Sequence, residues 1–225
     1  MGIGAATARA FAGAGAKIAV AARSTHLLEQ LVTELRAGGS DAIAITTDLL
    51  DVEQTRRAVE ETVRHFGGLD VLVNNAGQAV AGMVEHLDLE SFNRIIELNV
   101  LAPLVTMQAA IPVLRQRGGG LIINVTSMVS KMALPGLAGY AATKCALNSL
   151  SDTARVELAP ENIRVISVYP RLTATGFGEH SLGDLELRSR QRATTSNLPV
   201  DSPEFVAERI VQAAIAEVQE QFMDH

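Results

Sequence analysis

A tyrosine and a lysine four residues apart, Tyr140 and Lys144, with Ser127 upstream, are the residues whose types and spacing best suit chemistry. The stretch around the pair has a helical pattern, and i, i+4 spacing puts both side chains on one helix face. A free phenol has a pKa of about 10, which a neighbouring ammonium lowers toward the range that acid/base catalysis needs. The pair therefore indicates proton transfer. The alternative is a half-buried tyrosine beside a surface lysine.

The composition favours one acidic globular domain. The chain has 225 residues, of which 48% are hydrophobic, and a net charge of -6, so it can bury a large core. With no basic stripe, a nucleic-acid partner is not expected. The one local basic cluster is Arg188, Arg190 and Arg192. We expect it to be a solvated helix face, with contact to an anionic substrate or carrier as the alternative.

The cysteine content and the apolar stretches indicate a cytoplasmic protein. Cys145 is the single cysteine, which excludes an internal disulfide framework. We expect it to be a buried small apolar residue, with a reactive thiol as the alternative. The five histidines lack metal-ligand spacing. The longest apolar stretch, residues 100–114, contains two prolines, a threonine and a glutamine, so neither a membrane span nor a signal peptide is expected.

Apolar runs alternate with helical patterns along the whole chain. Strands are expected over residues 17–22, 42–47, 69–74, 121–126 and 163–169, and helices over 5–14, 27–37, 53–66, 89–117 (bent or broken near Pro103), 137–158 and 204–222. The strands are apolar nearly throughout, which is typical of a parallel sheet buried on both faces. The sequence therefore predicts a doubly wound, Rossmann-like α/β fold with helices on both faces, as one domain over 1–225. Residues 176–203 follow the last strand and are expected to form a substrate loop.

Two glycines, Gly2 and Gly4, stand at the very start of the first helix. Glycines at a helix start let the backbone approach a pyrophosphate, whose charge the helix N-terminus stabilises. The strand that should precede such a turn is absent from the sequence, so this motif alone is a weak indication.

Taken together, six motifs in order resemble the single-domain branch of the short-chain dehydrogenase/reductase family. They are Gly2-Ile3-Gly4 at the end of its glycine turn, the adenine-contacting pair Asp48-Leu49, Asn74-Asn75-Ala76-Gly77 after its fourth strand, Asn99 on the long helix, the catalytic set Ser127, Tyr140 and Lys144, and Pro170 with Thr173 and Thr175 after its sixth strand. Each is weak alone, and jointly they are specific.

Two departures from the family pattern stand out. Arg171 replaces a usual glycine near the nicotinamide end, where it would either crowd the pocket or add a positive charge. The family's first strand, which is the middle of its sheet, is missing, as is its last strand after Phe222. The resemblance thus implies unpaired backbone on both neighbours of the first strand. We expect a chain truncated at both ends, through a start codon assigned too late or as a natural fragment.

The resemblance implies hydride transfer between a nicotinamide and a carbonyl or alcohol. Tyr140 would be the acid/base, and Lys144 would lower its pKa and bond the nicotinamide ribose. Ser127 would bond the substrate oxygen, and Asn99 would hold a water that links Lys144 to solvent. The alternatives are that Ser127 ends a strand and Asn99 caps a kinked helix.

The cofactor-binding residues also have alternatives. Asn75, Ala76 and Gly77 are expected to form a backbone turn near the adenosine, and Asp48 could be a strand-end cap. Arg23 ends the strand after the glycines, where an acidic residue would select NAD(H). An arginine there favours the 2′-phosphate of NADP(H), with NAD(H) possible and a surface arginine as the alternative.

Other functions stay open at this point. The chain could be a non-catalytic or inactive truncated member of the same fold that acts as a binding protein. It could also be a 3-oxoacyl-carrier-protein reductase, for which the arginine cluster is faint support. An extended-branch epimerase is not expected, because no second domain fits in the length. The expected partners are a small carbonyl or alcohol substrate and further copies of the chain, as a homodimer or homotetramer.

Overall fold

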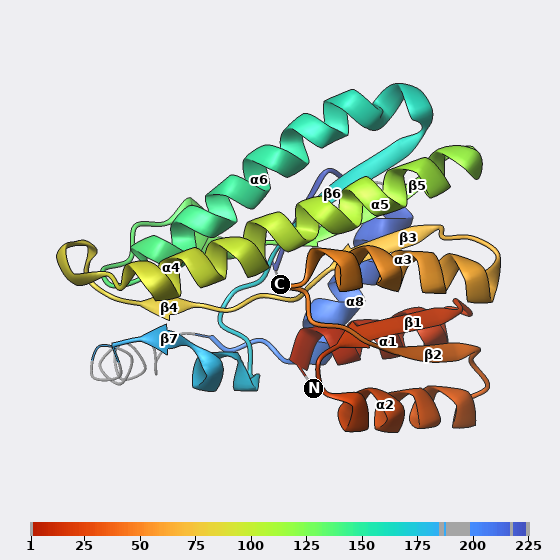
Figure 1. The fold of residues 1–225 in the computed structure, drawn as a ribbon, viewed down its shortest axis with the longest axis horizontal. Coiled ribbons are helices and arrows are strands. Elements are labelled where there is room, and N and C mark those ends of the chain that lie inside the picture. Colours follow the sequence, from red (N-terminus) through yellow and green to blue (C-terminus); the bar gives the residue numbers. More distant parts are fainter. Residues whose placement is uncertain (1, 185–186, 188–198, 217, 224–225) are drawn as a thin grey trace.

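The computed structural model describes residues 2–184, 187, 199–216 and 218–223 of the chain (Figure 1). Its helices are α1 (Gly2–Gly13), α2 (Thr25–Ala37), α3 (Val52–Phe66), α4 (Leu89–Ile96), α5 (Ala102–Gln116), α6 (Ala138–Leu158) and α8 (Pro203–Ala216). Its strands are β1 (Ile18–Ala22), β2 (Ala42–Thr46), β3 (Val71–Asn74), β4 (Val80–Ala81), β5 (Gly120–Val125), β6 (Ile163–Tyr169), β7 (Leu182–Gly183) and β8 (Glu220–Phe222). Strands and helices alternate, as the hydrophobic pattern predicts.

All strand pairs are parallel. β1 pairs with β2, β3–β5–β6–β8 form a four-stranded sheet in that order, and the short β4 pairs with β7. In the four-stranded sheet, Gly120 lies opposite Ile163 and Val71 opposite Leu121. Parallel strands need crossover connections, and here these are helices. The predicted Rossmann-like α/β fold is confirmed.

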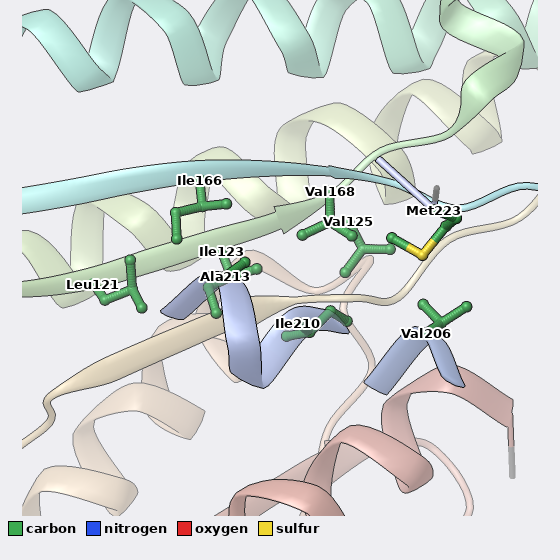
Figure 2. Packing of buried hydrophobic residues seen from close by; sticks show 9 residues of the cluster. All are labelled: Leu121, Ile123, Val125, Ile166, Val168, Val206, Ile210, Ala213 and Met223. Carbon is green, nitrogen blue, oxygen red and sulfur yellow. The ribbon is translucent and has the colours of Figure 1, made fainter. Parts of the chain in front are cut away.

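The central strand β5 sends alternate side chains into two apolar layers. Leu121, Ile123 and Val125 pack against α8, together with Met223 and residues of β6 (Figure 2). Ile122 points the other way, into a cluster formed with α3, α5 and α6. Because side chains alternate along a strand, a strand covered on both faces must be apolar at every position. This explains the unbroken apolar run in the sequence.

The sheet is divided between β1 and β3. Among the described residues no strand pairs with the free edge of either one. Lys17, just before β1, holds its ammonium 5.8 Å from the ring centroid of Phe66, just before β3, so the two strands begin at the same end. A cavity of about 890 Å³ separates them. β1 and β3 therefore each have one unpaired edge within the described residues.

Two local features shape the helix ends. The carboxylate of Asp51 accepts hydrogen bonds from the backbone N–H groups of Glu53 and Gln54, which caps α3. The long helix over 89–117 is interrupted, as predicted, by a π-helical turn over Glu97–Leu101 that joins α4 to α5. A π turn is a local device that often occurs at functional sites.

Two predictions were wrong. The helix expected to reach Phe222 ends at Ala216, and β8 follows and pairs with β6, although no strand was expected at this end of the sequence. The stacked rings of Phe222 and Tyr169, 4.7 Å apart, fix this last strand, which the sequence pattern was too short to reveal. Cys145 is exposed rather than buried, because α6 turns that face away from the core. Its thiol donates to the carbonyl of Ser130.

Two further expectations concern a membrane span and the substrate loop. By length and composition alone, the helical region Leu89–Gln116 is long and apolar enough to cross a membrane, which we had not expected from the prolines and polar residues in its apolar stretch. In the structure, 39% of its most apolar window is buried in the fold, and Leu114 packs in the core. The cluster Arg188, Arg190 and Arg192 lies outside the described residues, as do residues 185–186 and 188–198 of the expected substrate loop.

Candidate active site

Helix α6 directs Tyr140 and Lys144 toward the carboxyl end of β5. Both side chains are buried, with 8% and 3% of their surface exposed. The Lys144 ammonium donates a hydrogen bond of 2.9 Å to the carbonyl of Val125, the last residue of β5. The i, i+4 spacing therefore does place both groups on one face, and that face packs inward.

Ser127 meets the tyrosine from the loop after β5. Its hydroxyl hydrogen-bonds with the Tyr140 phenol. The same oxygen accepts from the N–H of Val129, 3.3 Å away, and caps a 3-10 turn over Met128–Lys131. Ser127 does end a strand, and its side chain also reaches the tyrosine. The predicted trio is thus assembled from two elements that follow one another in the chain.

Asn99 lies in the π turn and is completely buried. Its amide oxygen accepts from the backbone N–H of Gln78 at 2.9 Å, and its amide nitrogen donates to the Gln78 carbonyl at 2.8 Å and to the Thr143 hydroxyl at 3.0 Å. The side chain therefore ties the segment after β3 to α6. Both polar atoms of the side-chain amide already have hydrogen-bond partners. The water expected at Asn99 would therefore have to bind its backbone carbonyl.

Gly77 is the point where three elements approach most closely. A Cβ at this position would lie 3.2 Å from the Asn99 amide oxygen and 3.4 Å from the Lys144 ammonium. We expected Gly77 to form a turn near the adenosine. The structure places it against two of the predicted catalytic side chains, where only a glycine leaves them undisturbed.

Burial dominates the protonation of the pair. It raises the pKa of Tyr140 to about 12, and the hydrogen bond from Ser127 opposes the rise. Burial also lowers the pKa of Lys144 to about 8. The expected lowering of the Tyr140 pKa by Lys144 is not seen in this geometry, in which the ammonium lies 5.9 Å from the ring centroid and bonds a carbonyl instead. Tyr140 is therefore a phenol with a proton to donate.

The N-terminus of α1 forms a rim at the same edge of the sheet. Gly2 has a φ of +69°, and a Cβ on it would lie 3.4 Å from the Thr175 methyl group. A Cβ on Gly4 would lie 2.6 Å from the Asn75 amide nitrogen, so this approach requires glycine. The backbone N–H groups of the first helical turn, Ile3 included, lack acceptors within the helix. Such a rim fits the pyrophosphate of a dinucleotide, as the glycine turn predicts.

The remaining predicted cofactor residues are more dispersed. Arg23 is exposed at the end of β1. The Asp48 carboxylate accepts from the N–H of Leu50 at 3.1 Å, so the strand-end cap considered as an alternative is formed. Leu49 lines the cavity between β1 and β3, and Ala76 is exposed beside Asn75.

A buried carboxylate, that of Asp201, holds the side chain of Arg171 in place. Its guanidinium makes a forked pair with Asp201, at 3.0 and 3.2 Å, and only 2% of the Asp201 side chain is exposed. The Thr173 hydroxyl donates to the Arg171 carbonyl, and Thr173 forms a bridge with Asp201. The arginine thus joins the 170–175 segment to the start of α8. The positive charge of Arg171 is therefore paired with a carboxylate of this chain.

Phe177 was not among the expected site residues. Its ring lies 5.7 Å from the ring of Tyr140, on a 3-10 turn (Gly176–His180) that begins at Thr175. The pairing of β4 with β7 and a hydrogen bond from Gln78 to the His180 carbonyl hold this turn over the site. Nothing in the spacing of residue 177 could have predicted this contact, because it depends on how the loop folds back.

Comparison with known proteins gives a consistent result. A family model described as short chain dehydrogenase matches residues 1–184. An uncharacterized oxidoreductase of Methylorubrum extorquens is 42% identical over 183 residues, which are 81% of this chain and 73% of that protein. A trans-4-hydroxycyclohexanecarboxylate dehydrogenase of Sinomonas cyclohexanicum is 36% identical over 196 residues, which cover 81% of this chain and 75% of that protein. An alcohol dehydrogenase from the archaeon Thermococcus sibiricus, solved with 5-hydroxy-NADP, superposes with a TM-score of 0.84 at 29% identity, covering 98% of this chain and 91% of that one.

Proposed function

The chain belongs to the short-chain dehydrogenase family of NAD(P)-dependent oxidoreductases, and on that premise we propose that it moves a hydride between NADP(H) and a carbonyl or secondary alcohol. The observation that carries the proposal is the buried Tyr140, which hydrogen-bonds Ser127 and stands one helical turn from Lys144. The 1–225 chain acts as one catalytic domain, with 176–203 as its substrate loop.

Tyr140 and Ser127 have separate roles in the proposed reaction. A bound nicotinamide supplies the hydride chemistry, and the protein supplies position and protons. In reduction, Tyr140 donates its phenolic proton to the carbonyl oxygen, which suits a tyrosine that burial keeps protonated. The Ser127 hydroxyl bonds the same substrate oxygen and stabilises the charge that develops there. In oxidation, Tyr140 takes the proton back.

Lys144 connects the tyrosine to the cofactor and to solvent. Its ammonium lies beside Gly77 and Asn99. We propose that this ammonium binds the ribose hydroxyl groups of the cofactor and resupplies protons to Tyr140. A water in this relay would use the Asn99 backbone carbonyl. The residue four positions later is Pro103, which has no N–H to donate to that carbonyl in an α-helical register.

Arg23 supports a preference for NADP(H). It ends β1, is exposed, and forms no ion pair within the described residues. A free guanidinium can pair with a 2′-phosphate, whereas NAD(H) selection in such folds relies on a carboxylate at this place. Gly2, Ile3, Gly4 and Thr175 hold the remainder of the cofactor in this proposal, with Thr173, Asp48, Leu49, Asn75, Ala76 and Gly77 beside them.

The substrate class is proposed from the aromatic side chain that lies against Tyr140. Phe177 offers an aromatic surface there, and the Sinomonas relative is named for a cyclic hydroxy acid. We therefore choose cyclic secondary alcohols and ketones as the first substrates to test.

We further propose a homodimer or homotetramer, because Leu101 and Val156, on the helical region 97–116 and on α6, expose large apolar side chains. Light scattering gives the mass that decides this.

The experiment that tests the function is Tyr140→Phe, assayed by nicotinamide absorbance with cyclohexanone and open-chain ketones. The variant should retain NADPH binding and lose turnover by a factor of about a thousand, since a positioned acid contributes that order of rate. The matched control is Tyr169→Phe, the same chemical change at the other tyrosine, whose hydroxyl bonds Glu220. A wild-type chain that binds NADPH without any turnover would favour the non-catalytic binding protein instead.

A further inference from the structure

The segment that follows β6, residues 170–177, touches three parts of the candidate site in turn. The carbonyl of its first residue, a proline, accepts a hydrogen bond of 3.0 Å from the backbone N–H of Met128, in the turn after β5. Thr175 lies against the first glycine of α1. The ring of Phe177 then lies 5.7 Å from the ring of Tyr140. The position of this one segment therefore affects the whole site.

Hydrogen bonds from the segment converge on one residue, Asp201. The Arg171 guanidinium donates to both oxygens of the Asp201 carboxylate, at 3.0 and 3.2 Å. The backbone N–H of Asp201 donates to the Leu172 carbonyl, and the Asp201 carbonyl accepts from the N–H of Ala174, both at 2.9 Å. The place of the segment is thus referred to a residue that lies 30 positions from Arg171 in the sequence.

Asp201 is a firm anchor because it lies next to the start of α8. Only 2% of its side chain is exposed. The hydroxyl of the next residue, Ser202, accepts from the backbone N–H of Phe205 at 3.0 Å in the first turn of α8. The same helix places Val206 and Ile210, both completely buried, in the core against β5 and β6 (Figure 2). A bond to Asp201 is therefore a bond to the core.

The side-chain pair contributes what the backbone bonds cannot. The backbone contact is an isolated bridge between Thr173 and Asp201, and neutral hydrogen bonds add little net stability. A forked arginine–carboxylate pair adds two charge-assisted bonds with a fixed mutual orientation. Removing the cation beside a buried carboxylate is costly, because water does not replace it there. We therefore expect the pair to decide whether the segment keeps its place.

We propose that Arg171 is a positioning residue for substrate specificity. Its pair with Asp201 holds Phe177 against Tyr140, where the ring forms the wall that selects cyclic substrates. Phe177 is 38% exposed, so its ring can contact a bound ligand as well as the tyrosine. The selection of substrates rests on the proposed function, whereas the positioning of Phe177 does not.

The first experiment follows Phe177 without any turnover. The chain has no tryptophan, so Phe177→Trp places a single such fluorophore on this turn. Adding Arg171→Met should raise the acrylamide quenching constant by about twofold or more, because a segment with fewer anchoring contacts opens at lower free energy. The matched control is Arg115→Met, which breaks an exposed forked pair with Glu161, at 2.7 and 2.8 Å, and should leave the quenching unchanged.

A second variant guards against loss of folding. Arg171→Met removes the cation beside a buried carboxylate, which can destabilise the whole chain. Arg171→Met/Asp201→Asn avoids this, because the amide is neutral, has nearly the same size and keeps the backbone bonds of residue 201. Circular dichroism checks the fold of each variant, and both should show the increased quenching.

The second experiment measures specificity at saturating NADPH. In Arg171→Met, KM for cyclohexanone should rise by about tenfold, the low end of what an apolar pocket contact contributes. KM for acetone, which has no ring, and kcat for both ketones should stay as in the wild type. Phe177→Ala should give the same split. The two changes together should raise KM no further, because Arg171 acts through Phe177.

Unchanged quenching in the folded variants would overturn the proposal. Additive effects of Arg171→Met and Phe177→Ala on KM would overturn it too, as would an equal rise in KM for both ketones, which a merely structural role would give. A wild-type chain without turnover would contradict the proposed function instead, and the quenching would still decide whether Arg171 positions Phe177.

Discussion

At the scale of single residues, the site combines a proton donor with a cation that burial has made weakly basic. Tyr140 and Lys144 are both desolvated, and desolvation disfavours the charged form of each. The tyrosine is therefore kept protonated, and the lysine is held near the point where it loses its proton. Ser127 opposes the shift on the tyrosine. Lys144 is therefore the member of the pair whose protonation changes at moderately alkaline pH, whereas Tyr140 stays protonated there.

The lysine gives a pH prediction for stability. Its pKa is about 8 in the folded chain, against an ordinary value of 10.5, so between these values the unfolded chain binds more protons. Stability must then rise with pH over this window, by roughly 2 to 3 kcal/mol. Lys144→Met should lack this rise. Urea unfolding of both proteins at pH 7 and pH 10 gives the comparison, because other groups cancel in the difference. Parallel pH dependences would contradict the burial of a charged lysine.

Arg23 gives a prediction for the cofactor. Arg23→Asp should weaken NADPH binding by at least about tenfold, since it removes a charge-assisted contact and adds repulsion, and should spare or improve NADH binding. Fluorescence titration of each reduced cofactor measures this. Arg94→Asp, the same change at an exposed position on α4, is the control and should leave both affinities unchanged. An unchanged preference in Arg23→Asp would refute the assignment.

At the scale of elements, the site depends on three segments that meet at Gly77, where the absence of a Cβ lets the side chains of Asn99 and Lys144 approach the backbone. In the loop after β3, Gly77 packs against the π turn and α6. The Asn99 side chain stabilises this contact with three hydrogen bonds. An uninterrupted α-helix from Leu89 to Gln116 would change the direction of Asn99. The π turn is thus what aims this side chain at both partners.

Gly77→Ala tests this arrangement. The added methyl group would press on Asn99 and Lys144, at 3.2 and 3.4 Å, and should lower kcat by about tenfold or more through misplacement of the lysine. Gly13→Ala is the matched control, because a Cβ at Gly13 meets nothing within 4 Å. Steady-state kinetics and a melting curve of each variant separate the effect on the site from an effect on folding. Normal turnover in Gly77→Ala would show that the contact is not critical.

At the scale of the whole molecule, the chain has two main sheets, the β1–β2 pair and the four-stranded sheet, besides the short β4–β7 pair. Among the described residues, the β1–β2 pair is attached to the four-stranded sheet through helices, with α1 packed on α8 and α3 packed on α5, and not through backbone hydrogen bonds between strands. The cofactor rim spans this division, since Gly4 and Asn75 belong to its two sides. In the proposed function, catalysis therefore depends on how firmly the two parts are held together.

Hydrogen exchange should reveal the division. Amides of β1 and β3 should exchange faster than those of β5 and β6, because strands with a free edge open at lower free energy than strands paired on both sides. Mass spectrometry of peptides that cover residues 18–22, 71–74, 120–125 and 163–169 measures this. Equal protection of all four strands would mean that the cavity is closed in solution.

The sequence by itself determined the parallel α/β fold and predicted a catalytic set, since both are written in local patterns. Continuous apolar runs specify strands covered on both faces, and the spacing of Tyr140 and Lys144 specifies one helix face. Only the tertiary structure decided what depends on contacts between distant segments: the strand β8, the exposure of Cys145, the Arg171–Asp201 pair and the position of Phe177. It also decided the protonation of the site, because a pKa follows from burial. Residues far apart in the chain create that burial, and no local pattern records it.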